Sequence, residues 1–180
     1  MPPPPPATEP LDHLLRRLTA ARAVRLHPDL SNDAHDCFFV CVAQALFGGG
    51  VVKRGAVTAA VAALRTLQRG EQQLLTSAAE RWMRRQLGRA ERESCGWAVP
   101  PVRNAGGGER MGVATDAVEA WCTAGAVGRP IVVLRAGGRP RLLFQVELLV
   151  AAPIVLWETV PRAGEAAMEA AVGHVRLVRS

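Results

Sequence analysis

Several features that would place a chain in a functional class are missing from these 180 residues. No run of about 18 apolar residues is free of charge, so we expect no membrane-spanning helix. The most apolar stretch, residues 142–156, is interrupted by two polar side chains and a proline, which favours buried strands. The N-terminus lacks a basic segment leading into an apolar one, so we expect no secretory signal there.

Cysteine is scarce, and its spacing argues against a structural zinc site. The four cysteines include no pair separated by two residues, the spacing that zinc sites commonly use. In the absence of a secretory signal they indicate free thiols in a reducing compartment, so we expect a cytoplasmic protein. The glycines at residues 106–108 lack the lysine and serine or threonine that follow in a phosphate-binding loop. We therefore expect neither a metal ion nor a cofactor.

Aromatic residues are also few, and the basic charge is dispersed. The net charge is +6, and Lys53 is the only lysine, so arginine carries nearly all the positive charge. With four phenylalanines, four tryptophans and no tyrosine, the chain has no basic and aromatic stripe of the kind that binds single-stranded nucleic acid. A nucleic-acid partner is therefore disfavoured. A basic, helix-rich RNA or scaffold binder stays an alternative, and its RNA affinity would fall steeply with salt.

The order of apolar patterns predicts one α+β domain at residues 10–180, preceded by an extended, mobile, proline-rich leader at residues 1–9. Helices are predicted at residues 10–26, 37–47, 51–68, 71–88 and 115–126. Strands are predicted at residues 131–134, 141–150, 153–157 and 173–179. Residues 95–113 are expected to form a long loop. N-terminal helices should therefore pack on a small, mostly antiparallel C-terminal sheet.

Cys37 is the best candidate for a reactive group. The polar stretch at residues 31–36 ends at this cysteine, and an apolar helix begins there. A helix N-terminus favours the thiolate, and its exposed N–H groups can bind the oxyanion of a tetrahedral intermediate. Cysteine is among the residue types most often buried, so Cys41, Cys95 and Cys122 are expected in the core.

A thiol nucleophile needs a base nearby, and His174 is the candidate. It opens the last predicted strand directly after a loop, a rigid and accessible position. His35, two residues before Cys37, is an alternative partner for the thiol. Asp33 could orient the base or could simply cap the helix that follows.

Three segments resemble blocks of the OTU (ovarian tumour) cysteine proteases. They are DAHDCFFVCVAQALFG at residues 33–48, MGVATDAVEAWCTAGAVGRPIVVL at residues 111–134, and GHVRLV at residues 173–178. The blocks occur in the family's order and cover roughly residues 30–180. The resemblance implies a papain-like OTU-type fold and a thiol protease or deubiquitinase. Its partners would be conjugates of ubiquitin or a ubiquitin-like protein.

The chain departs from the family's pattern around the cysteine and after the histidine. Ala34 stands where the family usually has aspartate, and His35 where it usually has glycine. Arg176 occupies the position two residues after the histidine, where the family often has an orienting polar residue, and arginine cannot accept a hydrogen bond. Asp33 is then the best substitute for the third member, followed by Asn104. If neither residue serves as the third member, the site is a dyad of Cys37 and His174.

Such loose blocks are more typical of viral OTU-like proteases than of cellular ones. The resemblance therefore also implies cleavage of the chain's own polyprotein, and a location in the host-cell cytoplasm. A groove for the basic tail of ubiquitin would need acidic residues on its rim, for which the candidates are Glu109, Asp116, Glu119 and Glu158. Two alternatives follow: a papain-like protease that cuts only its own polyprotein in cis, and an inactive OTU-like binding module.

Overall fold

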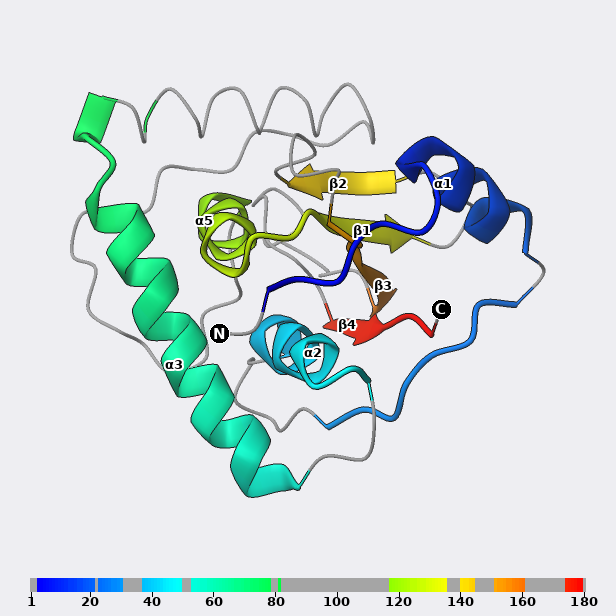
Figure 1. Cartoon of the computed structure of the whole chain (residues 1–180), viewed down its shortest axis with the longest axis horizontal. Helices are drawn as coiled ribbons and strands as arrows, with labels where there is room; N and C mark the ends of the chain where they lie inside the picture. Colours follow the sequence, from blue (N-terminus) through cyan, green and yellow to red (C-terminus); the bar gives the residue numbers. More distant parts are fainter. Residues whose placement is uncertain are drawn as a thin grey trace.

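The chain is an α+β protein whose helices surround one mixed sheet (Figure 1). The computed structural model describes residues 3–21, 23–30, 37–49, 53–78, 81, 117–135, 140–144, 151–160 and 174–179. The helices are α1 (Leu11–Ala20), α2 (Cys37–Leu46), α3 (Arg54–Gln73) and α5 (Ala117–Val127). The strands are β1 (Ile131–Arg135), β2 (Pro140–Phe144), β3 (Ile154–Val160) and β4 (His174–Leu177).

Two helix predictions need correction. The helix predicted over residues 10–26 ends at Ala20, and residues 23–30 run in non-helical conformation before the chain reaches α2. The break predicted at Gly70 is wrong, because α3 continues through it to Gln73. A single glycine costs a helix only about 1 kcal/mol, which the buried face of a 20-residue helix offsets.

The strand order is β2-β1-β3-β4. β1 pairs with β2 and β3 pairs with β4 in antiparallel fashion, whereas β1 and β3 are parallel. The sheet is therefore mixed, with antiparallel pairing at both edges. β4 is an edge strand, which leaves its outer side open to another segment of the chain.

Both faces of the central strand β1 are buried, as its uninterrupted run of aliphatic residues predicts. Ile131 and Val133 point to the face that α2, α3 and α5 cover. Val132 and Leu134 point to the opposite face, where Leu18 of α1 packs. This two-sided packing fixes the register of the sheet, since a slip of one residue would exchange the two faces.

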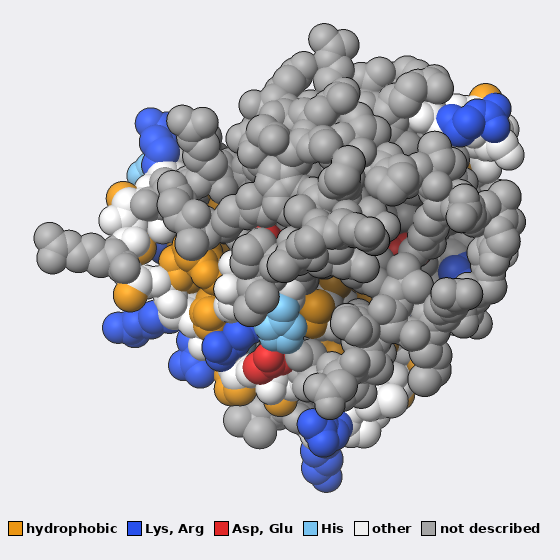
Figure 2. Space-filling model, turned by 180° about the vertical axis from the view of Figure 1, so that it is seen from behind, with side chains coloured by type: hydrophobic (Ala, Val, Ile, Leu, Met, Phe, Trp, Pro, Cys, Tyr) orange, Lys and Arg blue, Asp and Glu red, His pale blue; other side chains and the backbone are white. Residues whose placement is uncertain are grey.

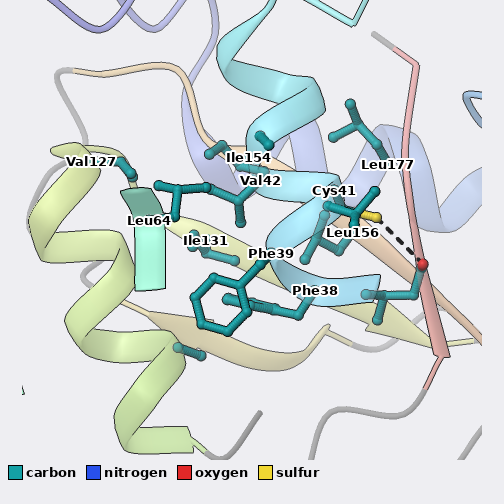
Figure 3. Packing of buried hydrophobic residues seen from close by; sticks show 14 of the residues in the cluster. Phe38, Phe39, Cys41, Val42, Leu64, Val127, Ile131, Ile154, Leu156 and Leu177 are labelled. Carbon is teal, nitrogen blue, oxygen red and sulfur yellow. Dashed lines mark hydrogen bonds between the residues drawn. The ribbon is translucent and has the colours of Figure 1, made fainter. Parts of the chain in front are cut away.

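The helix α2 occupies the centre of the larger core. Its residues from Phe38 to Gln44 are all buried, and Phe38 and Phe39 are each 1% exposed. Figure 3 shows these side chains between α5 on one side and the strands on the other. A helix that is apolar on all sides is stable only when it is buried on all sides. Its first residue is therefore held in a fixed position relative to the sheet.

The end of α2 is set by two glycines. Gly48 and Gly49 have φ angles of 75° and 73°, and the N–H of Gly49 donates to the carbonyl of Gln44 at 2.9 Å. A Cβ on Gly49 would lie 2.6 Å from Cε1 of His27. Glycine is therefore required there both for the backbone conformation and to leave room for the segment that carries His27.

The described part of the leader lies against the start of β3. Pro6 forms an isolated antiparallel bridge with Ala151, and the N–H of Ala152 donates to the carbonyl of Pro5 at 2.8 Å. The mobility predicted for residues 1–9 stays a prediction, but Pro5 and Pro6 have defined partners. Among the helices of the described residues, none combines the length and the apolar character needed to cross a membrane.

Candidate active site

Cys37 is the first residue of α2, and it is partly exposed. The first turn of this helix contains no acidic residue that would oppose a thiolate. From Phe38 onward the helix is buried, so Cys37 lies where the core meets the surface. This position combines access for a substrate with the N–H groups of a helix N-terminus.

Cys41 is one turn further along α2 and has a different environment. It is 5% exposed, and its Sγ donates to the carbonyl of Val175 at 3.4 Å. Burial raises the pKa of the Cys41 thiol, and nearby Cys37 and Asp29 raise it further. Cys41 is thus a protonated core thiol. Cys122 is buried as well, and Cys95 lies outside the described residues.

His174 begins β4 and forms a pair with a carboxylate that the sequence analysis did not select. Its Nε2 lies 2.7 Å from Oδ2 of Asp29, and the two side chains are 37% and 39% exposed. Figure 2 shows a histidine next to an acidic side chain on the face of the molecule turned away in Figure 1. With the Nε2 proton donated to Asp29, Nδ1 is the ring nitrogen that can accept a proton from a thiol.

The contact between α2 and β4 brings Cys37 and His174 to the same end of this helix–strand pair. Near the start of both elements, Cys41 of α2 is bonded to Val175 of β4. Near their ends, Gly49 lies against His27, whose N–H donates to the carbonyl of Leu177. The helix and the strand therefore run in the same direction. Cys37 lies one helical turn before Cys41 on the same face, and His174 directly precedes Val175.

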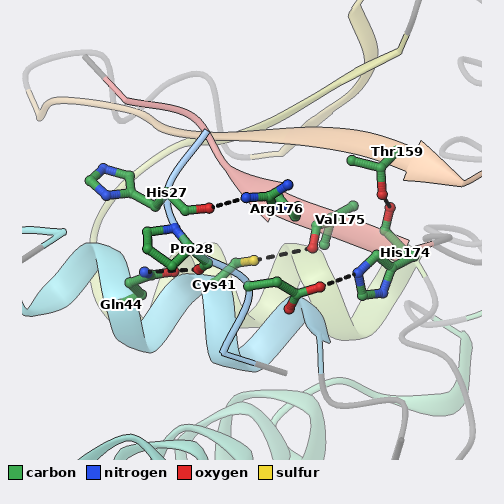
Figure 4. Close-up of polar contacts among 9 residues, drawn as sticks. His27, Pro28, Cys41, Gln44, Thr159, His174, Val175 and Arg176 are labelled. Carbon is green, nitrogen blue, oxygen red and sulfur yellow. Dashed lines mark hydrogen bonds and ion pairs between the residues drawn. The ribbon is translucent and has the colours of Figure 1, made fainter. Parts of the chain in front are cut away.

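Figure 4 shows this arrangement, with the start of α2 beneath the paired His174 side chain.

Asp29 follows directly after a short segment that pairs with the open edge of β4. The N–H of His27 donates to the carbonyl of Leu177 at 2.8 Å, and the N–H of Arg179 donates to the carbonyl of Arg25, also at 2.8 Å. These bonds and the bridge between residues 26 and 178 form a short antiparallel ladder. This pairing places Asp29 beside the start of β4, where His174 lies.

Two side-chain donors fix the carbonyl groups directly before Asp29. Nη2 of Arg176 donates to the carbonyl of His27 at 2.7 Å, and Nε2 of Gln44 donates to the carbonyl of Pro28 at 3.3 Å. Gln44 is 2% exposed, so its bond is shielded from water. Arg176 does not orient His174 itself. It holds the segment whose aspartate contacts His174 (Figure 4).

Asp33, the third residue expected from sequence, lies outside the described residues, as do His35 and Asn104. The sequence analysis assigned no site role to the His-Pro-Asp stretch at residues 27–29. The proximity of Asp29 to His174 is visible only from the strand pairing, because that pairing connects positions at least 150 residues apart. The described carboxylate that contacts His174 is Asp29.

The candidate groove rim is only partly described. Glu109 and Asp116 lie outside the described residues, and Glu119 is half-buried in the first turn of α5. Glu158 is wrong as a rim residue, because it lies within β3 and is 2% exposed. Its neighbours on the strand alternate between the two cores, so a side chain at this position faces the interior.

The described residues contain no group of three or more histidine, cysteine, aspartate or glutamate side chains that could hold a metal ion. Comparison of the chain with known protein families, with curated proteins and with solved structures yields no match.

Replacing Arg176 tests the positioning of Asp29. We expect Arg176→Gln to lower the free energy of unfolding by about 1–3 kcal/mol, because it removes a charge-assisted hydrogen bond to the carbonyl of His27. Urea denaturation followed by circular dichroism measures the change. Arg25→Gln removes the same charge from an exposed position in the same segment and is the matched control. Equal stability of the two variants would contradict the role given to Arg176.

The buried Cys41 thiol predicts a loss of stability at alkaline pH. Its pKa in the fold is raised above the ordinary value of 9.0, so above pH 9.0 the unfolded chain releases a proton that the folded chain keeps. The free energy of unfolding should then fall by up to about 1.4 kcal/mol per pH unit. Tyrosine is absent and lysine occurs once, so the other groups that titrate in this range are chiefly the remaining cysteines, which Cys41→Ser leaves in place.

Urea denaturation between pH 8 and pH 10.5 measures this loss. Cys41→Ser is the matched control, because its hydroxyl can donate to the carbonyl of Val175 but does not titrate in this range. The slope of stability against pH should be shallower in this variant. Parallel curves for the two proteins would show that Cys41 does not carry the effect.

Proposed function

We propose that the chain is a thiol-dependent hydrolase that cleaves peptide or isopeptide bonds, with Cys37 as nucleophile and His174 as base. The observation that carries the proposal is the 2.7 Å contact between His174 and Asp29, at the start of a strand that packs on the helix beginning at Cys37. A partly exposed thiol, a histidine and an orienting carboxylate are the three parts of such a site.

The proposed reaction gives each of these residues a role. Nδ1 of His174 takes the proton of the Cys37 thiol, and the thiolate attacks the carbonyl carbon of the scissile bond. N–H groups at the start of α2 bind the oxyanion in this proposal. The imidazolium then gives its proton to the leaving amine, and a thioester remains on Cys37. Water, deprotonated by His174, hydrolyses the thioester and releases the acid.

We further propose that the α+β fold is of the papain-like OTU type and that the substrate is a ubiquitin conjugate or the chain's own polyprotein. The three blocks that resemble OTU proteases support this assignment, since they supply the helix of Cys37, the region of α5 and β1, and the strand of His174. The family often places the orienting residue two positions after the histidine. Here we assign that role to Asp29, which precedes the cysteine in the chain.

A ubiquitin probe with a C-terminal electrophile tests the substrate class. We expect one covalent adduct per chain, located at Cys37 by mass spectrometry of the digested product. An adduct with iodoacetamide at Cys37 but none with the ubiquitin probe would favour the protease that acts only in cis on its polyprotein. A Cys37 that reacts with neither reagent would favour the inactive binding module.

A further inference from the structure

A pocket of about 370 Å³ lies at the other end of α2 and β4 from the candidate active site. It is partly open, and residues of the leader, α1, the turn after α2 and the strands β3 and β4 line it. His27, Gly49 and Leu177 are among its lining residues. In Figure 4 the ring of His27 points away from His174, so the pocket is separate from the site proposed for hydrolysis. Its volume falls in the range of small-molecule sites.

The wall of this pocket contains a buried arginine that has no acidic partner among the described residues. Arg129 is 8% exposed, and its Nε donates to the carbonyl of Ala152 at 2.7 Å. Its Nη2 lies 3.5 Å from the carbonyl of Pro153. Burial lowers the pKa of Arg129, which reflects the cost of holding its charge away from water. Carbonyl groups neutralise such a charge only in part, and a buried cation is normally paired with an anion.

The described charged groups of the lining carry a net positive charge. Among the described lining residues Glu9 is the one carboxylate, and it already contacts Arg17 at 2.6 Å. Arg179 lies at the rim. The pKa of His27 is lowered by burial and by the charge of Arg179, which disfavours a positive charge on its imidazole. Arg129 and Arg179 therefore remain as positive charges without a carboxylate partner among the described residues.

Much of the remaining wall is apolar. Leu14 and Leu18 of α1 face Val155 and Val178 across the smaller core, and Pro6 of the leader is also part of the lining. A bare inorganic anion would leave these surfaces in contact with water. A ligand that carries an anionic group on an aliphatic body would cover both parts of the wall.

We propose that this pocket binds an amphiphilic anion, with a carboxylate or phosphate head group against Arg129 and a single aliphatic chain against α1. The head group supplies the acidic partner that Arg129 lacks among the described residues, and Arg179 adds a second positive charge at the rim. The aliphatic chain contacts Leu14 and Leu18. The site is independent of the hydrolase proposal, and its test needs no hydrolase assay.

Isothermal titration calorimetry with four probes tests this site. Decanoate and decyl phosphate carry both parts of the proposed ligand, whereas acetate lacks the chain and decanol lacks the charge. We expect a single site for decanoate or decyl phosphate, with binding at least about tenfold weaker for the other two probes. Binding of either anion supports the proposal, and the ratio of their affinities identifies the preferred head group.

Two variants complete the test. Arg129→Gln should weaken decanoate binding at least about tenfold, while Arg54→Gln, the same change at an exposed position on α3, should leave it unchanged. If Arg129→Gln does not fold, Leu14→Trp fills the pocket from a partly exposed position on α1 and should abolish binding. Unchanged decanoate affinity in the folded variants, or decanol binding as tightly as decanoate, would overturn the proposal.

Discussion

Replacing Cys37 with alanine is expected to abolish cleavage of a fluorogenic ubiquitin substrate, with a loss in kcat of about 10⁴-fold or more. The change removes the sulfur proposed to form the covalent intermediate, and no other described cysteine is placed to replace it. Cys41 and Cys122 are both buried, and burial keeps Cys41 protonated. Steady-state kinetics on the purified protein, with the substrate well above its KM, measures the loss.

Cys41→Ser is the matched control for this experiment. It also removes one thiol from α2, one turn further along the helix, and can keep the hydrogen bond to Val175. We expect this variant to retain most of the activity. Cys37→Ala should stay folded, because a partly exposed side chain contributes little to the core, and thermal unfolding checks this. Turnover that survives in Cys37→Ala would place the nucleophile elsewhere.

The sequence was most informative where local patterns decide the structure. The apolar run after Cys37 has the length of a buried helix, and the shorter aliphatic run at residues 131–134, with proline before it and glycines after it, has the length of a buried strand. Those two patterns are enough to predict the helix that begins at Cys37 and the central strand of the sheet. The start of the last strand at His174 follows from its alternating pattern in the same way, within one residue.

The partner of His174 could not be predicted by such patterns. Asp29 reaches it because the segment around His27 pairs with the edge of β4, and that pairing joins two stretches about 150 residues apart. Nothing in the local sequence of residues 25–29 shows an edge strand, since Pro28 interrupts it. The end of α3 was missed for a different reason. Burial of one helix face outweighs the low helix propensity of Gly70.

The Asp29 carboxylate should matter for catalysis through the tautomer of His174. As an acceptor, it keeps the proton on Nε2, so that Nδ1 can take the thiol proton. In Asp29→Asn the amide can donate instead, which favours the tautomer with the proton on Nδ1. We expect kcat to fall about 100-fold with KM nearly unchanged, because the role proposed for Asp29 is to orient His174 and not to bind the substrate. Nitrogen NMR of the His174 ring should show the change of tautomer directly.

Asp29→Glu and Glu71→Gln separate positioning from general effects of charge. The longer glutamate keeps an acceptor, so it should restore part of kcat and the original tautomer. Glu71→Gln makes the same carboxylate-to-amide change at an exposed position on α3 and should leave kinetics and tautomer as they are. If Asp29→Asn raised KM instead, or lost activity with no change of the imidazole signals, then Asp29 would serve the fold of the segment and not the base. A dyad of Cys37 and His174 would remain, and its orienting group would have to come from another part of the chain.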